Sequence, residues 1–153
     1  MKFSTREDVS APVEQVFAAL CDVTRFERAA LRRGARLRRL DDLPAPAPGM
    51  AWDMAFRFRG KPRNMVAQIR RLDPPALVEY AGASANVELS VVVSLLALSR
   101  TQTRMHVELL LRPRSLGARL LVQSARLARP RLTRKYAEAV RRLARDIETR
   151  AAR

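Results

Sequence analysis

The sequence predicts an α+β domain in which a seven-stranded antiparallel sheet packs against a long C-terminal helix. Through most of the chain, apolar and polar residues alternate with a period of two, which is typical of strands with one buried face. Near the C-terminus the period becomes that of a helix. There, one side of the predicted helix carries Leu132, Tyr136, Ala139, Val140, Leu143 and Ile147. Such a stripe needs an apolar surface to lie on, and the sheet provides one.

The overall composition indicates one domain, over residues 1–153. This length is enough to bury a core, and no shift in composition marks a second domain. The N-terminus lacks the apolar segment of a signal peptide, and the single cysteine, Cys21, cannot form an internal disulfide. The longest apolar run, residues 91–98, is too short to cross a bilayer. We therefore expect a cytoplasmic protein.

The N-terminal region predicts one strand followed by two short helices. Residues 2–9 alternate in polarity, and Pro12 suits the first turn of a helix. The buried side of that helix is predicted to carry Val13, Val16, Phe17 and Leu20. Thr24 is placed to cap a second short helix, over about residues 25–33, which ends at Gly34.

Six further strands are predicted, over about residues 35–41, 50–58, 63–72, 77–82, 86–99 and 103–112. The proline-rich segment 41–49 between the first two of them cannot pair in a sheet and is predicted to be a turn or flap. The remaining connections are short, and short connections between consecutive strands produce an antiparallel meander. The long helix then follows, over about residues 116–148.

One local pattern has a counterpart in a known family. Residues 9–27 read VSAPVEQVFAALCDVTRFE: a strand end, Ala-Pro-Val-Glu, an apolar Val-Phe pair, then an aspartate and an aromatic residue. This pattern and the order of elements resemble the START-like superfamily, also called SRPBCC or Bet v 1-like, most of all its bacterial polyketide cyclase/dehydrase and lipid-transport branch. The resemblance implies a helix-grip fold, with an elongated apolar cavity between the sheet and the long helix. It also implies that Asp22 caps a helix junction.

The apolar face of the predicted sheet is the candidate ligand-binding surface. Methionine and aromatic side chains make adaptable walls for lipophilic ligands, although they serve equally well as core. The predicted ligand-binding residues are Trp52, Met54, Phe56, Phe58, Met65, Tyr80, Val91, Val93, Met105, Val107 and Leu120. We expect binding, or transport, of a small hydrophobic ligand or lipid. The alternative is a cyclase or dehydratase that acts on a polyketide-like substrate.

Few residues are candidates for catalysis. Glu7 falls on the apolar face of the first strand and Tyr80 points inward, and a buried carboxylate can act as a general acid or base. A single carboxylate is not a catalytic constellation, so both are weak candidates and an enzyme is not the favoured interpretation. His106 is the only histidine and is predicted to face solvent, and Cys21 is predicted to be a packed thiol. No metal or cofactor is expected.

Pro130 lies inside the predicted long helix and removes one backbone donor. A kink or a short preceding helix is therefore expected at this point. Two interpretations stay open. Residues 116–129 could form a lid over the cavity mouth, or the proline could simply bend the helix around the sheet.

The net charge of +15 is concentrated in two segments. Residues 112–153 contain thirteen basic and three acidic side chains, and residues 25–40 contain seven and one. We expect one positive surface formed by Arg25, Arg28, Arg32, Arg33, Arg141, Arg142 and Arg145. An anionic membrane surface is the expected partner, with a peripheral location at the inner membrane face. Nucleic acid is a weaker alternative, because no recognition motif accompanies the charge.

Overall fold

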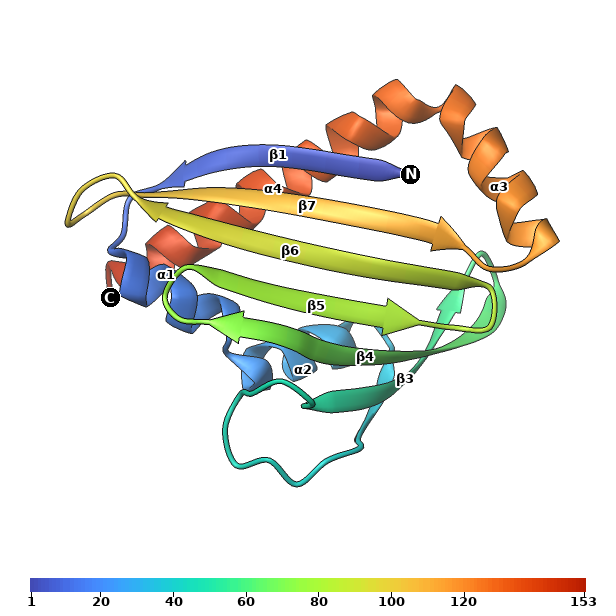
Figure 1. Ribbon diagram of the computed structural model, residues 1–153, viewed down its shortest axis with the longest axis horizontal. Helices are drawn as coiled ribbons and strands as arrows, with labels where there is room; N and C mark the ends of the chain where they lie inside the picture. The colour runs from blue at the N-terminus through green and yellow to red at the C-terminus, as the bar shows by residue number, and fades with distance from the viewer.

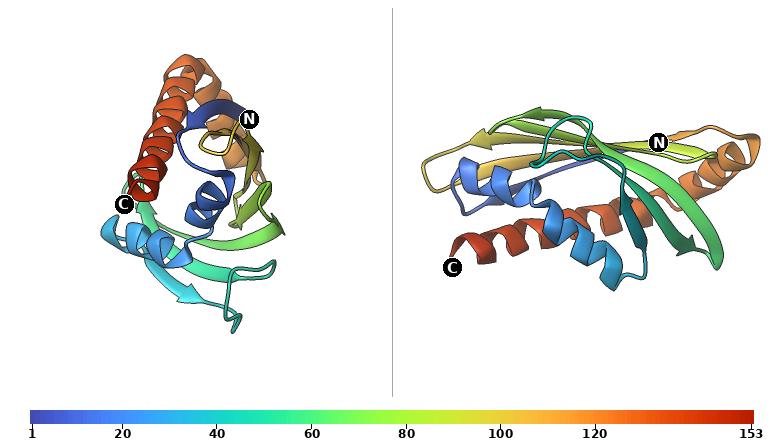
Figure 2. Two further views of the ribbon diagram at one scale, coloured as in Figure 1. Left: turned by 90° about the vertical axis from the view of Figure 1, so that its left-hand side faces the viewer. Right: turned by 90° about the horizontal axis from the view of Figure 1, so that it is seen from below.

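The computed structural model describes residues 1–153 and has seven antiparallel strands in one sheet, with the helices on one side (Figures 1 and 2). The strands are β1 (Lys2–Val9), β2 (Arg36–Arg39), β3 (Ala51–Phe58), β4 (Lys61–Asp73), β5 (Leu77–Ala83), β6 (Val87–Ala97) and β7 (Thr103–Pro113). The helices are α1 (Val13–Leu20), α2 (Val23–Arg32), α3 (Leu116–Leu127) and α4 (Arg129–Ala151). The predicted fold class is confirmed, and the predicted strand ends differ from these by at most two residues.

The strand order is β1-β7-β6-β5-β4-β3-β2. The six strands from β2 to β7 therefore form a meander, and β1 pairs with the last of them, from Lys2 opposite Leu110 to Val9 opposite Thr103. Helices α1 and α2 connect the β1 edge of the sheet to the β2 edge and lie on the same side as α4 (Figure 2). This side is called the inner face below.

The start of α2 differs from the sequence prediction. The helix begins at Val23, and its cap is Asp22, whose carboxylate accepts a hydrogen bond from the Arg25 backbone N–H at 3.2 Å. The predicted cap, Thr24, instead lies inside the first turn. Aspartate at this position satisfies one of the N–H groups that a helix start leaves without a partner, so the helix begins earlier than the pattern suggested.

The predicted long helix is two helices. Ala128 separates them: it is the C-cap of α3 and the N-cap of α4, with φ −99° and ψ 15°. The two helices run in clearly different directions on its two sides (Figure 1). Pro130 lies in the first turn of α4, where its missing N–H leaves no helical hydrogen bond unmade. The short preceding helix that was one of the two expectations at Pro130 is therefore what forms.

The core lies between the inner face and helices α1 and α4. Its central cluster joins Val16 of α1, Val93 of β6, Met105 of β7, and Val140 and Ile147 of α4, all of them buried. Two tyrosine side chains connect layers: Tyr136 of α4 donates to the Val107 carbonyl oxygen and Tyr80 of β5 to the Leu20 carbonyl oxygen, each at 2.5 Å. The helices are therefore attached to the half of the sheet where β6 ends and β7 begins.

A smaller cluster lies under α2. Met50, Trp52 and Ile69 are buried there, and the Phe26 ring of α2 meets the Trp52 ring edge-on at a centroid distance of 5.3 Å. The proline-rich connection before β3 is held by Asp41, whose carboxylate accepts from Arg39 at 2.6 Å and from the Ala51 N–H at 2.8 Å. This arrangement holds the pKa of Asp41 well below its usual range.

Candidate ligand-binding site

The strand register brings ten of the eleven predicted ligand-binding residues together on the inner face, and the eleventh, Leu120, is on α3 instead. On β3 and β4, Trp52 lies opposite Ala67 and Met54 opposite Met65, and directly opposed residues of an antiparallel pair share a face. On β5 to β7, Tyr80 lies opposite Val91, and Val93 opposite Val107. Met105, two residues before Val107 on β7, shares its face. The period of two therefore assigned the faces of these strands correctly.

Burial divides these residues into two groups. Trp52, Val93, Met105 and Val107 are buried by neighbouring elements and belong to the core. Met54, Phe56, Met65, Tyr80 and Val91 are half-buried, and Phe58, at the tip of the β3–β4 hairpin, is 52% exposed. Leu120, on α3, is 58% exposed. An apolar strip of the inner face, toward the hairpin ends near α3, is therefore only partly covered.

Gly82 lies in the middle of this strip and leaves space for the side chains on both sides of β5. It follows Tyr80 by two residues on β5, opposite Ala67 on one side and Leu89 on the other. A Cβ at this position would lie 2.8 Å from the Met65 Sδ and 3.3 Å from the Leu89 Cγ. The glycine therefore allows Met65 and Leu89 to approach each other across β5. Leu89 and its opposite residue Leu111 were not predicted as site residues, although extending the alternation from Val91 and Val107 would have found them.

One charged side chain lies in the same strip. Arg63 on β4 is opposite Phe56 on β3, two residues from Met65, and is half-buried. Its Nε is buried without a hydrogen-bond partner. Sequence reasoning missed Arg63 because arginine is common throughout this chain, although alternation from Met65, two residues further along β4, would have placed it on the same face.

The two weak catalytic candidates are both engaged in structural contacts. Glu7 is on β1, and its Oε1 lies 3.4 Å from the Nε of Arg141 on α4. Tyr80 donates its hydroxyl hydrogen to the Leu20 carbonyl oxygen, and burial raises the pKa of that phenol well above its usual value. A carboxylate in an ion pair and a phenol held by a helix end are not arranged as an acid and a base around a common point.

Two surface depressions lie elsewhere. One, of about 420 Å³, is lined by Arg6, Glu7, Asp8 and Arg104, with an ion pair of 2.9 Å between Arg104 and Asp8. The other, of about 340 Å³, lies between α1 and the end of α4. Neither is lined by any of the predicted ligand-binding residues. Neither depression is therefore the elongated apolar cavity that the family resemblance implies.

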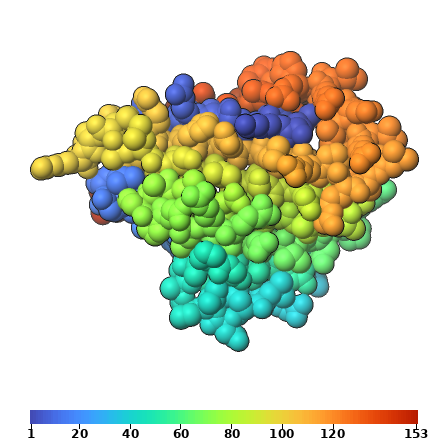
Figure 3. Space-filling model, in the orientation of Figure 1, coloured from blue at the N-terminus to red at the C-terminus, as the bar shows by residue number.

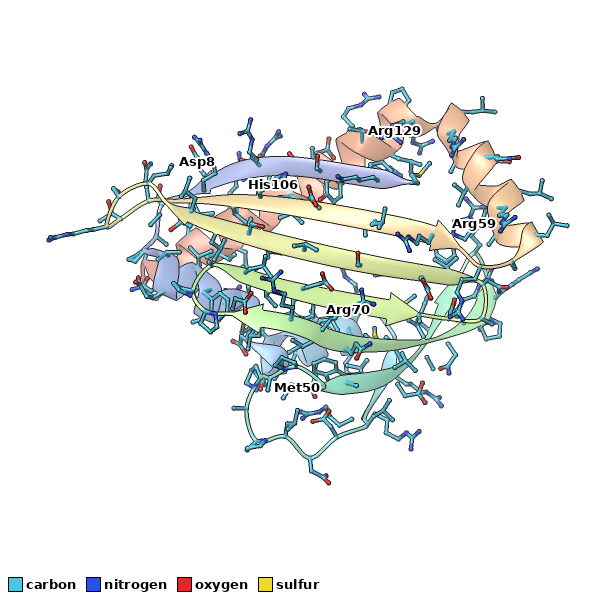
Figure 4. All side chains as sticks on the ribbon, in the orientation of Figure 1. Asp8, Met50, Arg59, Arg70, His106 and Arg129 are labelled. Atoms are coloured by element: carbon cyan, nitrogen blue, oxygen red, sulfur yellow. The ribbon has the colours of Figure 1, made fainter.

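His106 and Cys21 are placed as predicted. Figure 4 shows His106 on β7, between the buried residues Met105 and Val107 and therefore on the opposite, outer face of the sheet. Cys21 follows the last residue of α1, and burial raises the pKa of its thiol to about 11. A thiol with this pKa is a poor nucleophile at neutral pH. No three His, Cys, Asp or Glu side chains come together as a metal site would require.

The predicted basic surface is partly neutralised. Arg25 of α2 reaches α4, where its Nη2 lies 3.0 Å from an Asp146 oxygen, so the two basic segments do meet. Asp146 also pairs with Arg150, and Glu7 pairs with Arg141. Of the predicted residues, Arg28, Arg32, Arg33, Arg142 and Arg145 are exposed and form none of these ion pairs.

Known proteins resemble this chain in structure more than in sequence. No family model and no curated protein matches the sequence. ZhuI aromatase/cyclase from Streptomyces sp. R1128 has a TM-score of 0.65 at 15% identity, covering 98% of this chain and 94% of its own. A START superfamily protein from Mycobacterium smegmatis has 0.62 at 14%, covering 99% and 97%. The di-domain aromatase/cyclase StfQ of steffimycin biosynthesis has 0.71 at 14%, with 99% of this chain matching 51% of StfQ. The protein thus has the same helix-grip fold as these structures.

Proposed function

We propose that the protein binds a small hydrophobic molecule non-covalently on the partly covered strip of its inner face. The main evidence for this proposal is the burial of three inner-face residues. Met54, Phe56 and Met65 face the helices yet remain half-buried, because α1, α2 and α4 cover other parts of the sheet. Concave surfaces lined by methionine and aromatic side chains suit lipophilic ligands. Burial of such a surface by a ligand is favourable by roughly 25 cal/mol per Å².

The structural neighbours support the same class of ligand. ZhuI and StfQ are named as aromatase/cyclases, and both share this fold. A cyclase or dehydratase acting on a polyketide-like molecule is therefore the alternative function. Non-covalent binding is favoured over it because the two residues that would supply an acid and a base have structural contacts. Glu7 forms an ion pair with Arg141, and the Tyr80 hydroxyl donates to a carbonyl oxygen at the end of α1.

Native mass spectrometry and a fluorescence titration test this proposal. The purified protein should retain a lipophilic molecule or bind fatty acids, and it should bind the neutral probe N-phenyl-1-naphthylamine. Met65→Gln should weaken probe binding, whereas Val66→Gln, on the next residue of β4 and the opposite face, should not. Absence of binding, or equal loss in both variants, would contradict the proposal. Turnover of a polyketide-like substrate that Glu7→Gln or Tyr80→Phe abolishes would favour the enzyme.

A second proposed function is docking on an anionic membrane surface through α3. Leu116, Leu120 and Leu127 are 75%, 58% and 90% exposed. At 3.6 residues per turn these positions lie within about 40° of one another around the helix axis, opposite the buried Ala118 and Val122. We call this row of three leucines the leucine ridge. Figure 3 shows α3, in orange, at one end of the molecule.

The charge around the leucine ridge favours an anionic membrane over the other possible partners. Residues 112–135 contain eight basic and no acidic side chains. A symmetric dimer through the ridge would bring two such segments face to face, which like-charge repulsion opposes. Nucleic acid would use the arginines but leave the leucines in water. An anionic bilayer satisfies both, since apolar side chains enter the interface and each basic residue adds about 1 kcal/mol. No helix is long and apolar enough to span a membrane, so docking would be peripheral.

Vesicle co-sedimentation tests this second proposal and separates it from the basic surface predicted on α2 and α4. Binding should occur with phosphatidylglycerol vesicles, not with phosphatidylcholine vesicles, and should weaken with salt. Leu120→Gln combined with Leu127→Gln should reduce it, whereas Leu31→Gln on α2, a leucine with the same 58% exposure as Leu120, should not. If changing Arg141, Arg142 and Arg145 to Glu abolishes binding and the ridge variants do not, the α2–α4 surface is the docking site. Binding to neither vesicle contradicts both surfaces, and tighter, salt-sensitive binding to duplex DNA or RNA indicates nucleic acid instead.

A further inference from the structure

Arg63 is a cation placed within an apolar surface. Its opposite residue on β3 is Phe56, and the next inner-facing residue of β4 is Met65, itself opposite Met54. Most basic side chains of this protein are exposed, but Arg63 is half-buried and its Nε is buried. Apolar neighbours on three positions therefore remove part of the water that would otherwise surround its charge.

No group of the protein balances this charge. Arg63 takes part in no ion pair, whereas Arg39, Arg104 and Arg141 are held by carboxylates. Among the inner-facing strand positions Glu7 is the one acidic residue, and Arg141 already occupies it. The buried Nε is also without a hydrogen-bond partner. A partly desolvated guanidinium that the chain leaves unpaired attracts an anion more strongly than a fully hydrated one does, because the attraction is screened less than in water.

We propose that Arg63 binds the anionic group of an amphipathic ligand whose apolar part lies on Met54, Phe56 and Met65. The inference rests on the proposed ligand-binding function and specifies its ligand class: a hydrophobic molecule that carries a carboxylate, sulfonate or phosphate. The planar guanidinium can donate two parallel hydrogen bonds to such a group. A neutral molecule of the same shape would fill the apolar strip and leave the charge of Arg63 unpaired.

A pair of probes that differ by one anionic group tests this inference. Anilinonaphthalene-8-sulfonate carries a sulfonate, and N-phenyl-1-naphthylamine is the same aromatic molecule without it. The sulfonate probe should bind the wild-type protein more tightly. Arg63→Met should weaken its binding by about 10- to 100-fold, the range expected for a charge-assisted hydrogen bond. The same variant should leave the neutral probe unchanged or bound more tightly.

The control is Arg57→Met. Arg57 lies next to Phe56 on β3 but points to the outer face, so this variant loses the same charge and should change neither affinity. The thermal midpoint provides a readout that a structural role would move in the opposite direction. Arg63→Met without ligand should unfold at the same temperature as the wild type or higher, since no native contact of the guanidinium is lost. A lower midpoint would indicate a structural role of Arg63, and the two probes would then be compared in Arg63→Gln.

The possible outcomes separate this inference from the function on which it rests. If the neutral probe binds and Arg63→Met affects the sulfonate probe no more than Arg57→Met does, the role of Arg63 is refuted and hydrophobic binding stands. If neither probe binds the wild-type protein, the ligand-binding function itself is refuted. Weaker binding of the sulfonate probe than of the neutral probe to the wild type would also overturn the role of Arg63.

Discussion

Replacement of Tyr80 by phenylalanine distinguishes a structural from a catalytic role of this residue. In the structure the Tyr80 hydroxyl connects β5 to the last turn of α1 through a 2.5 Å hydrogen bond to the Leu20 carbonyl oxygen. Phenylalanine preserves the ring and its packing beside the core cluster, so the change removes only the hydroxyl. The variant therefore measures the contribution of this one connection.

The expected loss of stability has two parts. A hydrogen bond contributes about 0.5–1.5 kcal/mol, and a carbonyl group left without a partner in a partly buried place costs about 1–3 kcal/mol. The carbonyl of Leu20 lies near the helix end, where water can replace the hydroxyl in part, so we expect a total of about 1–2 kcal/mol. For a domain of this size, that corresponds to a decrease in thermal midpoint of about 2–8 °C.

Thermal unfolding followed by circular dichroism measures this change, with binding of N-phenyl-1-naphthylamine measured on the same variant. We expect a lower midpoint and retained binding, because the change removes the hydroxyl that holds α1 and leaves the aromatic ring in place. An unchanged midpoint would show that the hydrogen bond to Leu20 does not stabilise the fold. An unchanged midpoint together with loss of turnover on a polyketide-like substrate would refute the structural assignment and indicate catalysis.

Three further predictions concern the core, the loop before β3 and the thiol. Ile147→Ala should lower the free energy of unfolding by about 2–5 kcal/mol in denaturant titrations, because the side chain is completely buried in the central cluster; a change below about 1 kcal/mol would contradict that position. Asp41→Asn should be less stable than the wild type at pH 7. Since the folded pKa of Asp41 is depressed, its stabilisation is complete above the unfolded value of about 3.9 and is lost at lower pH, so the difference in midpoint should shrink only on acidification. Cys21 should react with iodoacetamide at pH 8 about 100-fold more slowly than an exposed cysteine, as a pKa of about 11 instead of 9.0 implies; equal rates would show that the thiol is not packed.

The sequence by itself determined the fold class and the inner face. Hydrophobic periods of two and then about 3.6 identified the strands and the C-terminal helical region, and they assigned Met54, Met65 and Met105 to the same side of the sheet. Such patterns are local: the face of a residue follows from its neighbours two to four positions away. For the same reason the sequence correctly placed His106 on the outer face.

Only the tertiary structure decided which part of that face is covered. The break at Ala128 directs α4 over the cluster of Val93 and Met105, and it leaves the strip around Met65 half-buried. Contacts between segments far apart in the chain also determined which charged side chains form ion pairs. Arg141 meets Glu7 across 134 positions, while Arg63 meets no carboxylate. Exposure and charge pairing depend on residues far apart in the chain, and a hydrophobic period contains no information about how far a helix extends over its sheet.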